Sequence, residues 1–303
     1  MQISYRHHGN HLVFERSRDE IRLQGLFPET IGPRTDLGAG SILQMQLTGE
    51  GRSLRNGNRS IGSVPGERMA YVSMVKDRRC HGRLIVVILK DPITDVLGEV
   101  NYLLCSKSPT IRTWVRIRND STMPVELDWV FSINLHNLAI GGLMPWYEKT
   151  YVHLGYDQWG GEGPWRRYTL EELGLLPSSR PGLSLAWQTS QAPGDMSKAL
   201  PVGMLEDVET RTVWYWQIDH LSSWYWEIGE DDNNQLYFLA GGPNSPRHSW
   251  RKELKPGESV HTVPVAFGCV EGGCQEALAA LARHYRNLIN DVRLKPYGRA
   301  VSY

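Results

Sequence analysis

The chain has 303 residues, with 33 Lys and Arg against 33 Asp and Glu, so its formal net charge is zero. This balance favours neither nucleic acid nor an anionic membrane surface as a partner, and the longest apolar run, Leu84–Leu89, has only the length of a strand. The four cysteines are too few and too scattered for a disulfide framework, and no signal-peptide core follows Met1. We therefore expect a cytoplasmic protein that can bury a large core in one unit.

Residues 1–135 show a succession of strand patterns. In Ile111–Asn119, side chains that suit a core alternate with Arg and Trp, which predicts a half-buried strand with a wet, basic face. The stretch 49–66 is rich in Gly, Ser, Arg and Asn and is expected to form an exposed loop. The expected strands are His11–Glu15, Glu20–Gln24, Ile42–Leu47, Met69–Lys76, Arg83–Lys90, Glu99–Leu104, Ile111–Asn119 and Val125–Leu135.

The stretch Asn137–Pro181 interrupts this succession with many glycines and three tryptophans, and we expect a long loop there. Its one regular piece is predicted to be a short helix, Leu170–Leu173. Thr169 followed by Glu172 is a capping-box pattern for the start of that helix. Long loops with so many aromatic side chains are more often functional than mere linkers.

The composition of this loop suits sugar recognition. Aromatic faces stack on the apolar side of a pyranose, while carboxylates and arginines bind its hydroxyls. The alternative is a small core of tryptophans that holds the loop in place, and the sequence leaves both interpretations open. The candidate substrate-binding residues are Trp146, Asp157, Trp159, Glu162, Trp165 and Arg166.

Strand patterns resume at Leu183–Thr189 and, after a second loop at Gln191–Pro201, reach the run Val213–Ile228, which holds four tryptophans. Trp214 and Trp216 share one face of a strand, Trp224 and Trp226 share one face of the next, and the pair is expected to form a β-hairpin. Strict alternation is what sheet packing requires, so core packing is favoured over ligand contact for these rings. Further strands are expected at Gln235–Ala240, Arg247–Leu254 and Val260–Phe267.

The last segment changes to a helical pattern. Apolar residues recur at helical spacing over Gln275–Val292, which predicts one amphipathic helix with an apolar stripe. A connector follows, and Arg299–Tyr303 has the character of a strand that has just begun. We therefore expect further structure beyond Tyr303. The stripe is Leu278, Leu281, Tyr285, Leu288, Ile289 and Val292.

Other patterns that could hold a cofactor or metal are weak. Cys269 and Cys274 make a poor zinc half-site because no second Cys or His pair has matching spacing. His7, His8 and His11 fit an N-terminal strand better than a metal site. No glycine pair lies in the strand–turn–helix setting of a phosphate loop, and no Ser lies in a nucleophile elbow. We expect no metal and no cofactor.

Several motifs resemble one known family. Leu89-Lys90-Asp91, Glu99-Val100-Asn101-Tyr102 and Ile111–Asn119 are similar to strands of the N-terminal β-supersandwich of family 36 glycoside hydrolases, the α-galactosidases. Leu254-Lys255-Pro256-Gly257-Glu258 with Thr262-Val263-Pro264 resembles the closing strands of that domain, and Gln275–Val292 resembles its linker helix. The resemblance covers about two thirds of the chain. The family's stretch rich in Ser, Gly and His is not recognisable in Pro177–Pro201.

The resemblance implies a mainly β fold, namely a large antiparallel two-sheet supersandwich like galactose mutarotase, with one C-terminal linker helix. It divides the chain into the supersandwich 1–270, the helix and connector 271–298, and the start of a (β/α)8 barrel at 299–303. The two catalytic aspartates of the family lie in that barrel, so no catalytic residue is assigned, and the chain alone is expected to be inactive. The implied substrates are α-galactosides, and the implied complete enzyme is a homo-oligomer, a tetramer or a dimer.

Three functions remain open. The first is the non-catalytic N-terminal portion of an α-galactosidase-like enzyme, which supports assembly and borders the substrate pocket. The second is a stand-alone carbohydrate-binding or mutarotase-like module, and the third is an assembly domain without a ligand. Sugar and linkage specificity and the oligomeric state do not follow from the sequence.

Overall fold

The structure is a computed structural model and describes residues 1–51, 59–79, 81–157, 163–177, 184–190 and 199–293. Among the described residues, strands hold 52% and helices 11%, and neighbouring strands in the sheets pair in the antiparallel direction. The mainly β, antiparallel fold class predicted from the sequence is therefore confirmed. No helix in the described part of the chain has both the length and the apolar character needed to cross a membrane.

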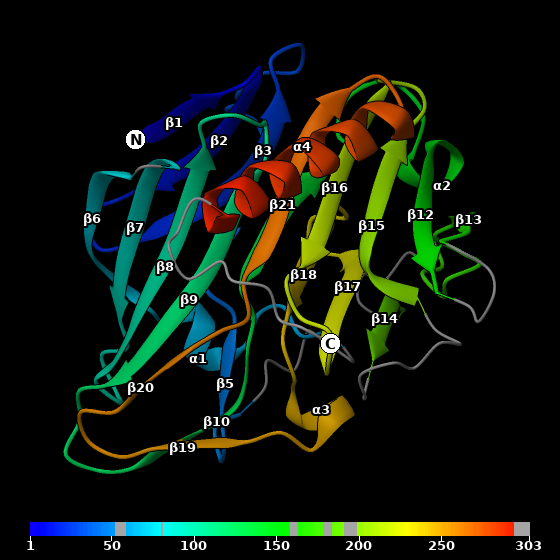
Figure 1. Cartoon of the computed structure of the whole chain (residues 1–303). Coiled ribbons are helices and arrows are strands. Elements are labelled where there is room, and N and C mark those ends of the chain that lie inside the picture. The colour runs from blue at the N-terminus through cyan, green and yellow to red at the C-terminus, as the bar shows by residue number, and fades with distance from the viewer. Residues whose placement is uncertain (52–58, 80, 158–162, 178–183, 191–198, 294–303) are drawn as a thin grey trace.

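One layer of the sandwich is a ten-stranded sheet (Figure 1). Strand β9 (Ile111–Asn119) lies near its middle, and the short strand β20 (Ser259–His261) pairs with part of β9. Apart from β20, the strands in spatial order are β13 (Trp165–Thr169), β12 (Thr150–Tyr156), β15 (Ala199–Asp207), β16 (Thr212–Ile218), β21 (Val265–Glu271), β9, β8 (Val96–Cys105), β7 (Gly82–Lys90) and β6 (Ala70–Arg79).

Three smaller sheets make up the other layer. The first is β1 (Gln2–His7), β2 (Asn10–Arg16), β3 (Ile21–Pro28) and β4 (Gly40–Ser41). The second is β19 (Lys252–Leu254), β10 (Val125–Val130) and β5 (Met45–Leu47). The third is β11 (Ile133–Leu138), β18 (Leu236–Gly241), β17 (Trp224–Glu230) and β14 (Ala186–Ser190).

The main core lies between these layers and draws residues from all four sheets. Its centre is aromatic. The ring of Trp216 on β16 lies 5.2 Å from that of Trp226 on β17 and 4.6 Å from that of Phe238 on β18, measured between centroids. Trp226 is fully buried and Trp216 is 2% exposed. The prediction that the alternating tryptophans fill a core is confirmed.

The predicted hairpin between the two tryptophan strands is wrong. β16 pairs with β15 and β21 in the large sheet, whereas β17 pairs with β14 and β18 in the opposite layer. The connection 219–223 therefore crosses from one layer to the other. Both faces of each strand are covered, so alternation identified the strands but could not tell a hairpin from a crossing between sheets.

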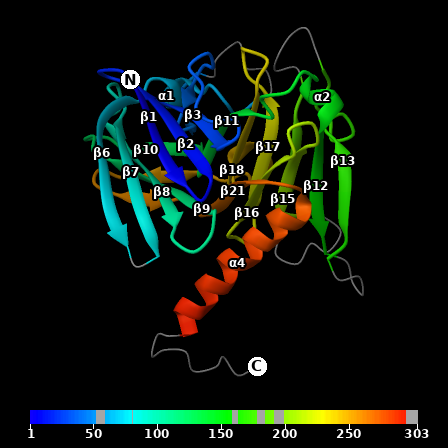
Figure 2. The same ribbon diagram turned by 90° about the horizontal axis from the view of Figure 1, so that it is seen from above.

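The outer face of the large sheet carries a long helix, α4 (Cys274–Arg293), which agrees with the predicted Gln275–Val292. Viewed from above, the helix lies on one side of the large sheet and the small sheets lie on the other (Figure 2). The predicted apolar stripe is only partly correct. Leu281 is buried, but Leu278 and Ile289 are exposed. The contact face is made mainly of Ala277, Ala280, Leu281 and His284.

The predicted long loop Asn137–Pro181 contains more regular structure than expected. The helix α2 (Trp146–Lys149) leads directly into β12, and β12 and β13 extend the edge of the large sheet. The predicted helix Leu170–Leu173 is a single turn instead. Its capping-box contacts do form, since Glu172 N–H donates to Thr169 Oγ1 and Thr169 N–H donates to Glu172 Oε2. Gly174, with a φ of +103°, then ends the turn.

Two further strand predictions need correction. The expected strand Val125–Leu135 is two strands, β10 and β11, which belong to different sheets. The expected strand Arg247–Leu254 begins instead with the helix α3 (Ser245–His248), whose start is capped by the Asn244 side chain, and only β19 is a strand. The remaining helix is α1 (Val64–Glu67).

We predict that Trp226→Ala lowers the free energy of unfolding by about 3–5 kcal/mol, because it removes a large buried ring from the centre of the core. Trp226→Phe should cost less, since the indole Nε1 has no hydrogen-bond partner in the described structure. Denaturant unfolding followed by circular dichroism measures both changes. The control is Trp165→Ala, whose ring is 37% exposed and whose loss should cost about 0.5 kcal/mol. Equal losses for the two alanine variants would contradict the central role of Trp226.

Candidate functional site

A hollow of about 640 Å³ lies at the outer edge of the small-sheet layer, and we name it the polar hollow for the charged and amide side chains in its lining, which also contains apolar residues. Its walls come from separate segments: the chain before β4, the chain around α1, strand β11 and the turn between β17 and β18. Tertiary structure alone brings these segments together. The lining residues are Gly38, Ala39, Gly40, Arg59, Ile61, Gly62, Val64, Glu67, Arg68, His136, Asp231, Asp232 and Asn233.

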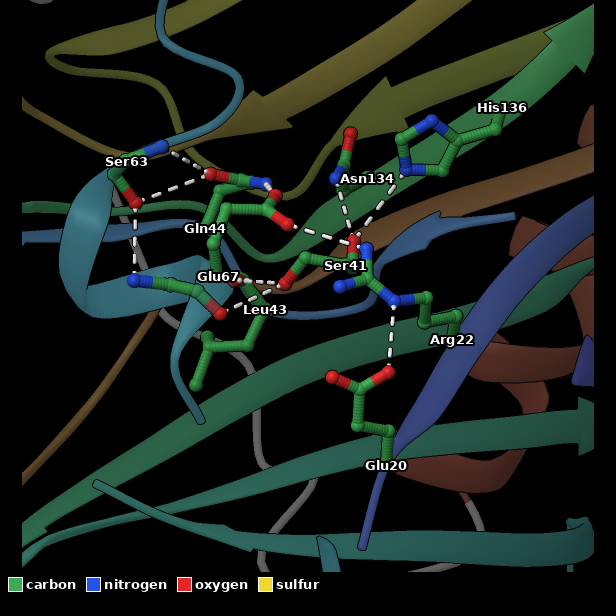
Figure 3. A network of polar contacts seen from close by, with 10 residues as sticks. Glu20, Arg22, Ser41, Leu43, Gln44, Ser63, Glu67, Asn134 and His136 are labelled. Atoms are coloured by element: carbon green, nitrogen blue, oxygen red, sulfur yellow. Dashed lines mark hydrogen bonds and ion pairs between the residues drawn. The ribbon is translucent and has the colours of Figure 1, made fainter. Parts of the chain in front are cut away.

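One wall of the hollow is held by hydrogen bonds around Gln44 (Figure 3). Gln44 Oε1 accepts from the N–H and the hydroxyl of Ser63 at 3.2 and 3.1 Å, and Gln44 Nε2 donates to Glu67 Oε1 at 3.1 Å. Ser63 Oγ in turn accepts from Gly66 N–H and so caps α1. Arg22 then donates to Glu67 Oε2 at 3.2 Å. This chain of contacts fixes α1 against the small sheets.

The floor of the hollow is His136 on β11. Its Nε2 faces the carbonyl of Ser41 at 3.4 Å, and the amide of Asn134 donates to the same carbonyl at 2.7 Å. Gly40 lies directly on the imidazole, so a Cβ at that position would come within 2.0 Å of the ring. Only glycine therefore fits there. Burial lowers the pKa of His136 from 6.5 to about 4, which keeps the ring neutral at pH 7.

The charged groups of the hollow are paired with one another or with neighbours. Arg68 donates to both carboxylate oxygens of buried Asp91 and of Glu50, at 2.7–2.9 Å. Arg59, whose side chain is 1% exposed, donates to Asp232 at 3.0 Å and to the carbonyl of Glu230. These contacts position rigid donors and acceptors around the hollow.

Buried Glu227 on β17 anchors the segment that precedes α1. Its carboxylate accepts four hydrogen bonds, from the N–H and hydroxyl of Ser60 and from the phenols of Tyr225 and Tyr237, at 2.6–2.9 Å. Burial raises the pKa of Glu227, and these four donors oppose the rise. Since the side chain is 0% exposed, it acts as a structural anchor and has no access to a ligand.

The hollow can offer hydrogen bonds of both kinds to a polar molecule. Its described lining contains no Phe, Tyr or Trp ring on which a sugar could stack. It also lacks a free pair of carboxylates, because Glu67 and Asp232 are in ion pairs and Asp231 accepts from the N–H groups of Asn233 and Gln235. The arrangement suits binding of a hydroxyl-rich ligand better than acid–base chemistry.

The structure separates the sugar-contact residues predicted from the sequence. Trp146 lies on α2, half-buried, and its Nε1 donates to Glu230 Oε1 at 2.8 Å. Trp165 lies near the other end of β12, opposite Gly155, and is 37% exposed. Asp157 and Arg166 are exposed near Trp165, and the guanidinium of Arg166 lies 5.4 Å from the centre of the Tyr156 ring. Trp159 and Glu162 lie outside the described residues.

No protein-family model and no curated protein matches this sequence. Solved structures do match it. The α-galactosidase AgaA of family GH36 from Geobacillus stearothermophilus superposes with a TM-score of 0.65 at 12% identity, over 90% of this chain and 41% of its own. The chain has the fold of one region of GH36 α-galactosidases. It spans about two fifths of their length.

Two further solved structures agree. The α-galactosidase from Lactobacillus brevis gives a TM-score of 0.62 at 14% identity, over 90% of this chain and 40% of its own. The galactosidase domain of the α-galactosidase–sucrose kinase AgaSK gives 0.63 at 12% identity, over 90% of this chain and 41% of its own. The resemblance inferred from the strand motifs is confirmed at the level of the fold.

The sequence analysis missed the polar hollow. Its residues are far apart in the chain, and each segment alone resembles a loop or a core strand. One signal was present: Asn134, His136 and Asn137 are polar residues in a strand that is buried at every position. Buried polar groups need partners, so such a run indicates a network.

We predict that the free energy of unfolding falls as the pH drops from 6.5 towards 4. In that range the unfolded chain binds a proton at residue 136, whereas folded His136, with its pKa near 4, does not. His136→Gln keeps a donor for the Ser41 carbonyl and should flatten the slope of stability against pH. The control substitution is His261→Gln on the exposed strand β20. Parallel slopes for wild type and His136→Gln would show that His136 does not titrate in this way.

Proposed function

We propose that this chain is the N-terminal, non-catalytic β-domain of an α-galactosidase-like glycoside hydrolase, and that it supports assembly with a catalytic (β/α)8 barrel. The observation that carries the proposal is the shared fold over 90% of the chain with GH36 α-galactosidases. The shared region is 41% of the AgaA chain, which leaves ample length in such an enzyme for a catalytic domain.

The proposed substrates are α-galactosides. AgaA variants have been solved in complex with raffinose and with stachyose, which are the ligands named for that protein. Retaining glycoside hydrolysis needs two carboxylates roughly 5–5.5 Å apart on either side of the bond. Because the carboxylates of the polar hollow are tied to arginines and backbone amides, we assign the chain no catalytic residue.

The proposed sugar contact lies at the edge strand β13. Trp165 and Arg166 are exposed there, Asp157 is nearby, and an edge strand can reach across an interface to a neighbouring pocket. Trp159 and Glu162 stay part of this proposal. Trp146 contributes less, because its ring is half-buried and its Nε1 is bound to Glu230.

Assembly is proposed to use the outer face of α4. Leu278 and Ile289 are 37% and 49% exposed, although the same helix buries Ala277, Ala280 and Leu281 on the sheet. Exposed apolar side chains on a long helix are suited to a partner surface. In the complete enzyme this surface would contact the barrel or another subunit of the homo-oligomer.

The alternative is a stand-alone carbohydrate-binding or mutarotase-like module. The observation that favours it is the polar hollow, which has the volume and the hydrogen-bonding groups for a monosaccharide. The two proposals differ in what the isolated chain does with sugar. The alternative requires binding of free galactose by the isolated chain, whereas the leading proposal does not.

We predict that the purified chain does not hydrolyse nitrophenyl α-galactoside. The physical reason is that no free carboxylate pair is available in the polar hollow. The measurement is release of nitrophenol, together with titration calorimetry with galactose. The control for contamination is Asp232→Asn, which removes a carboxylate of the hollow. Turnover that is present in the wild type and lost in Asp232→Asn would overturn the non-catalytic assignment, and galactose binding would favour the alternative module.

We predict that Trp165→Ala in the complete enzyme weakens binding of stachyose about two- to tenfold, with little effect on nitrophenyl α-galactoside. The longer sugar extends beyond the reacting galactose and can stack on an exposed ring, whereas the short substrate cannot. KM values for both substrates measure the effect. Tyr147→Ala is the matched control, because Tyr147 is 42% exposed and lies on α2, which precedes β12, whereas Trp165 pairs with Gly155 near the far end of β12. Equal effects on both substrates would argue against a stacking role.

A further inference from the structure

Three side chains that can bind a metal converge on the outer face of the large sheet. They are His153 on β12, Glu206 on β15 and Cys274, the first residue of α4. Their donor atoms, an imidazole nitrogen, a carboxylate oxygen and the thiol sulfur, all lie within 4.8 Å of one another. His153 Nε2 and Glu206 Oε2 are 2.9 Å apart.

The fold explains the convergence. In the pairing of β12 with β15, His153 lies opposite Met204, and Glu206 lies two residues further along β15 on the same face. This is the face that α4 covers, since Met204 packs against the helix in the cluster that includes Cys274. The three residues are far apart in sequence, so spacing could not reveal them. The zinc half-site rejected above paired Cys274 with Cys269, which is buried and is not part of the cluster.

We infer that His153, Glu206 and Cys274 form a site for a divalent transition metal, with Zn²⁺ the best match. One imidazole, one carboxylate and one thiolate are common zinc ligands, and three protein ligands leave a fourth position for water. Zinc bonds of about 2.0–2.3 Å at tetrahedral angles require donors roughly 3.3–3.6 Å apart. The side chains need to move by only about 1 Å to reach that geometry.

Two features oppose the metal and define the competing interpretation. Arg167 lies 3.5 Å from Glu206 Oε2 and supplies a competing positive charge. Burial, with the nearby Glu206 carboxylate, raises the pKa of Cys274 to about 11, so a metal must displace the thiol proton. The competing interpretation is a hydrogen-bonded His153–Glu206 pair with an inert thiol beside it. Arg167 is half exposed, and its guanidinium also lies over the Tyr151 ring. It can therefore release the Glu206 carboxylate and still keep contact with solvent and with that ring.

A metal at this position would join three elements. It would tie the edge of the large sheet, β12 and β15, to the first turn of α4. Such a bond stabilises the folded state by the free energy of metal binding, because the unfolded chain does not hold the three ligands together. The inference concerns the chain's own stability and does not depend on the proposed α-galactosidase role.

The test is titration of the purified chain with Co²⁺, followed by displacement with Zn²⁺. We expect one Co²⁺ per chain, with visible d–d bands of four-coordinate cobalt and a thiolate-to-cobalt charge-transfer band. Cys274→Ser should abolish the charge-transfer band, and Glu206→Gln should weaken binding by at least about tenfold. Cys105→Ser, which removes a buried thiol outside the cluster, is the matched control and should change neither the charge-transfer band nor the Co²⁺ affinity. Arg167→Gln should tighten binding, because it removes the competing cation.

A second measurement covers variants that fold poorly. Zn²⁺ should raise the unfolding temperature of the wild type and of Cys105→Ser, and should leave that of Cys274→Ser unchanged. A charge-transfer band that persists in Cys274→Ser would overturn the inference. So would the same Co²⁺ affinity in the wild type and in the His153→Gln variant.

Discussion

The contact between Trp216 and Trp226 holds the two layers of this fold together. Each ring belongs to a different sheet, so their packing joins the layers where the chain crosses between them. Phe238 completes the cluster on the small-sheet side. Once the inward faces of β16 and β17 are fixed in this way, their outward faces are fixed too, because side chains alternate along a strand. The outward face of β16 then receives α4, and that of β17 carries the buried Glu227 anchor.

Side-chain periodicity reveals where strands are but not how they pair. The ends predicted for Ile111–Asn119 match the observed ones because one face of this strand is buried and the other only partly buried, which leaves a clear alternation. The tryptophan strands are buried on both faces, so nothing local distinguishes a hairpin from a crossing between layers. In β12 and β13 the strand pattern is short and lies among glycines and tryptophans, and pairing along the edge of the large sheet decides their structure.

For the candidate sites, too, local sequence patterns do not tell which residues become neighbours in the fold. The aromatic and charged composition of residues 146–166 indicated sugar recognition, but composition does not tell which side chains lie together, and β12 holds Trp146 and Trp165 apart. The polar hollow and the His153–Glu206–Cys274 cluster are each assembled from distant segments. The need for glycine at position 40 comes from the ring of His136, which lies against it and belongs to a distant segment. The sequence supplies the chemistry of such residues, and strand pairing supplies their neighbours.

The crossing segment also explains how α4 is oriented. Asp219, at the start of the crossing, accepts from Arg112 Nε on β9 at 2.8 Å and from the hydroxyl of Tyr285 on α4 at 2.6 Å. Burial raises the pKa of Tyr285, so the phenol stays protonated and remains a donor. One carboxylate thus links the large sheet, the crossing between layers and the helix. Because α4 is held on this side, Leu278 and Ile289 must point away from the sheet. The contacts of Asp219, at the start of the crossing between the layers, therefore help to determine which face of the helix is left for a partner.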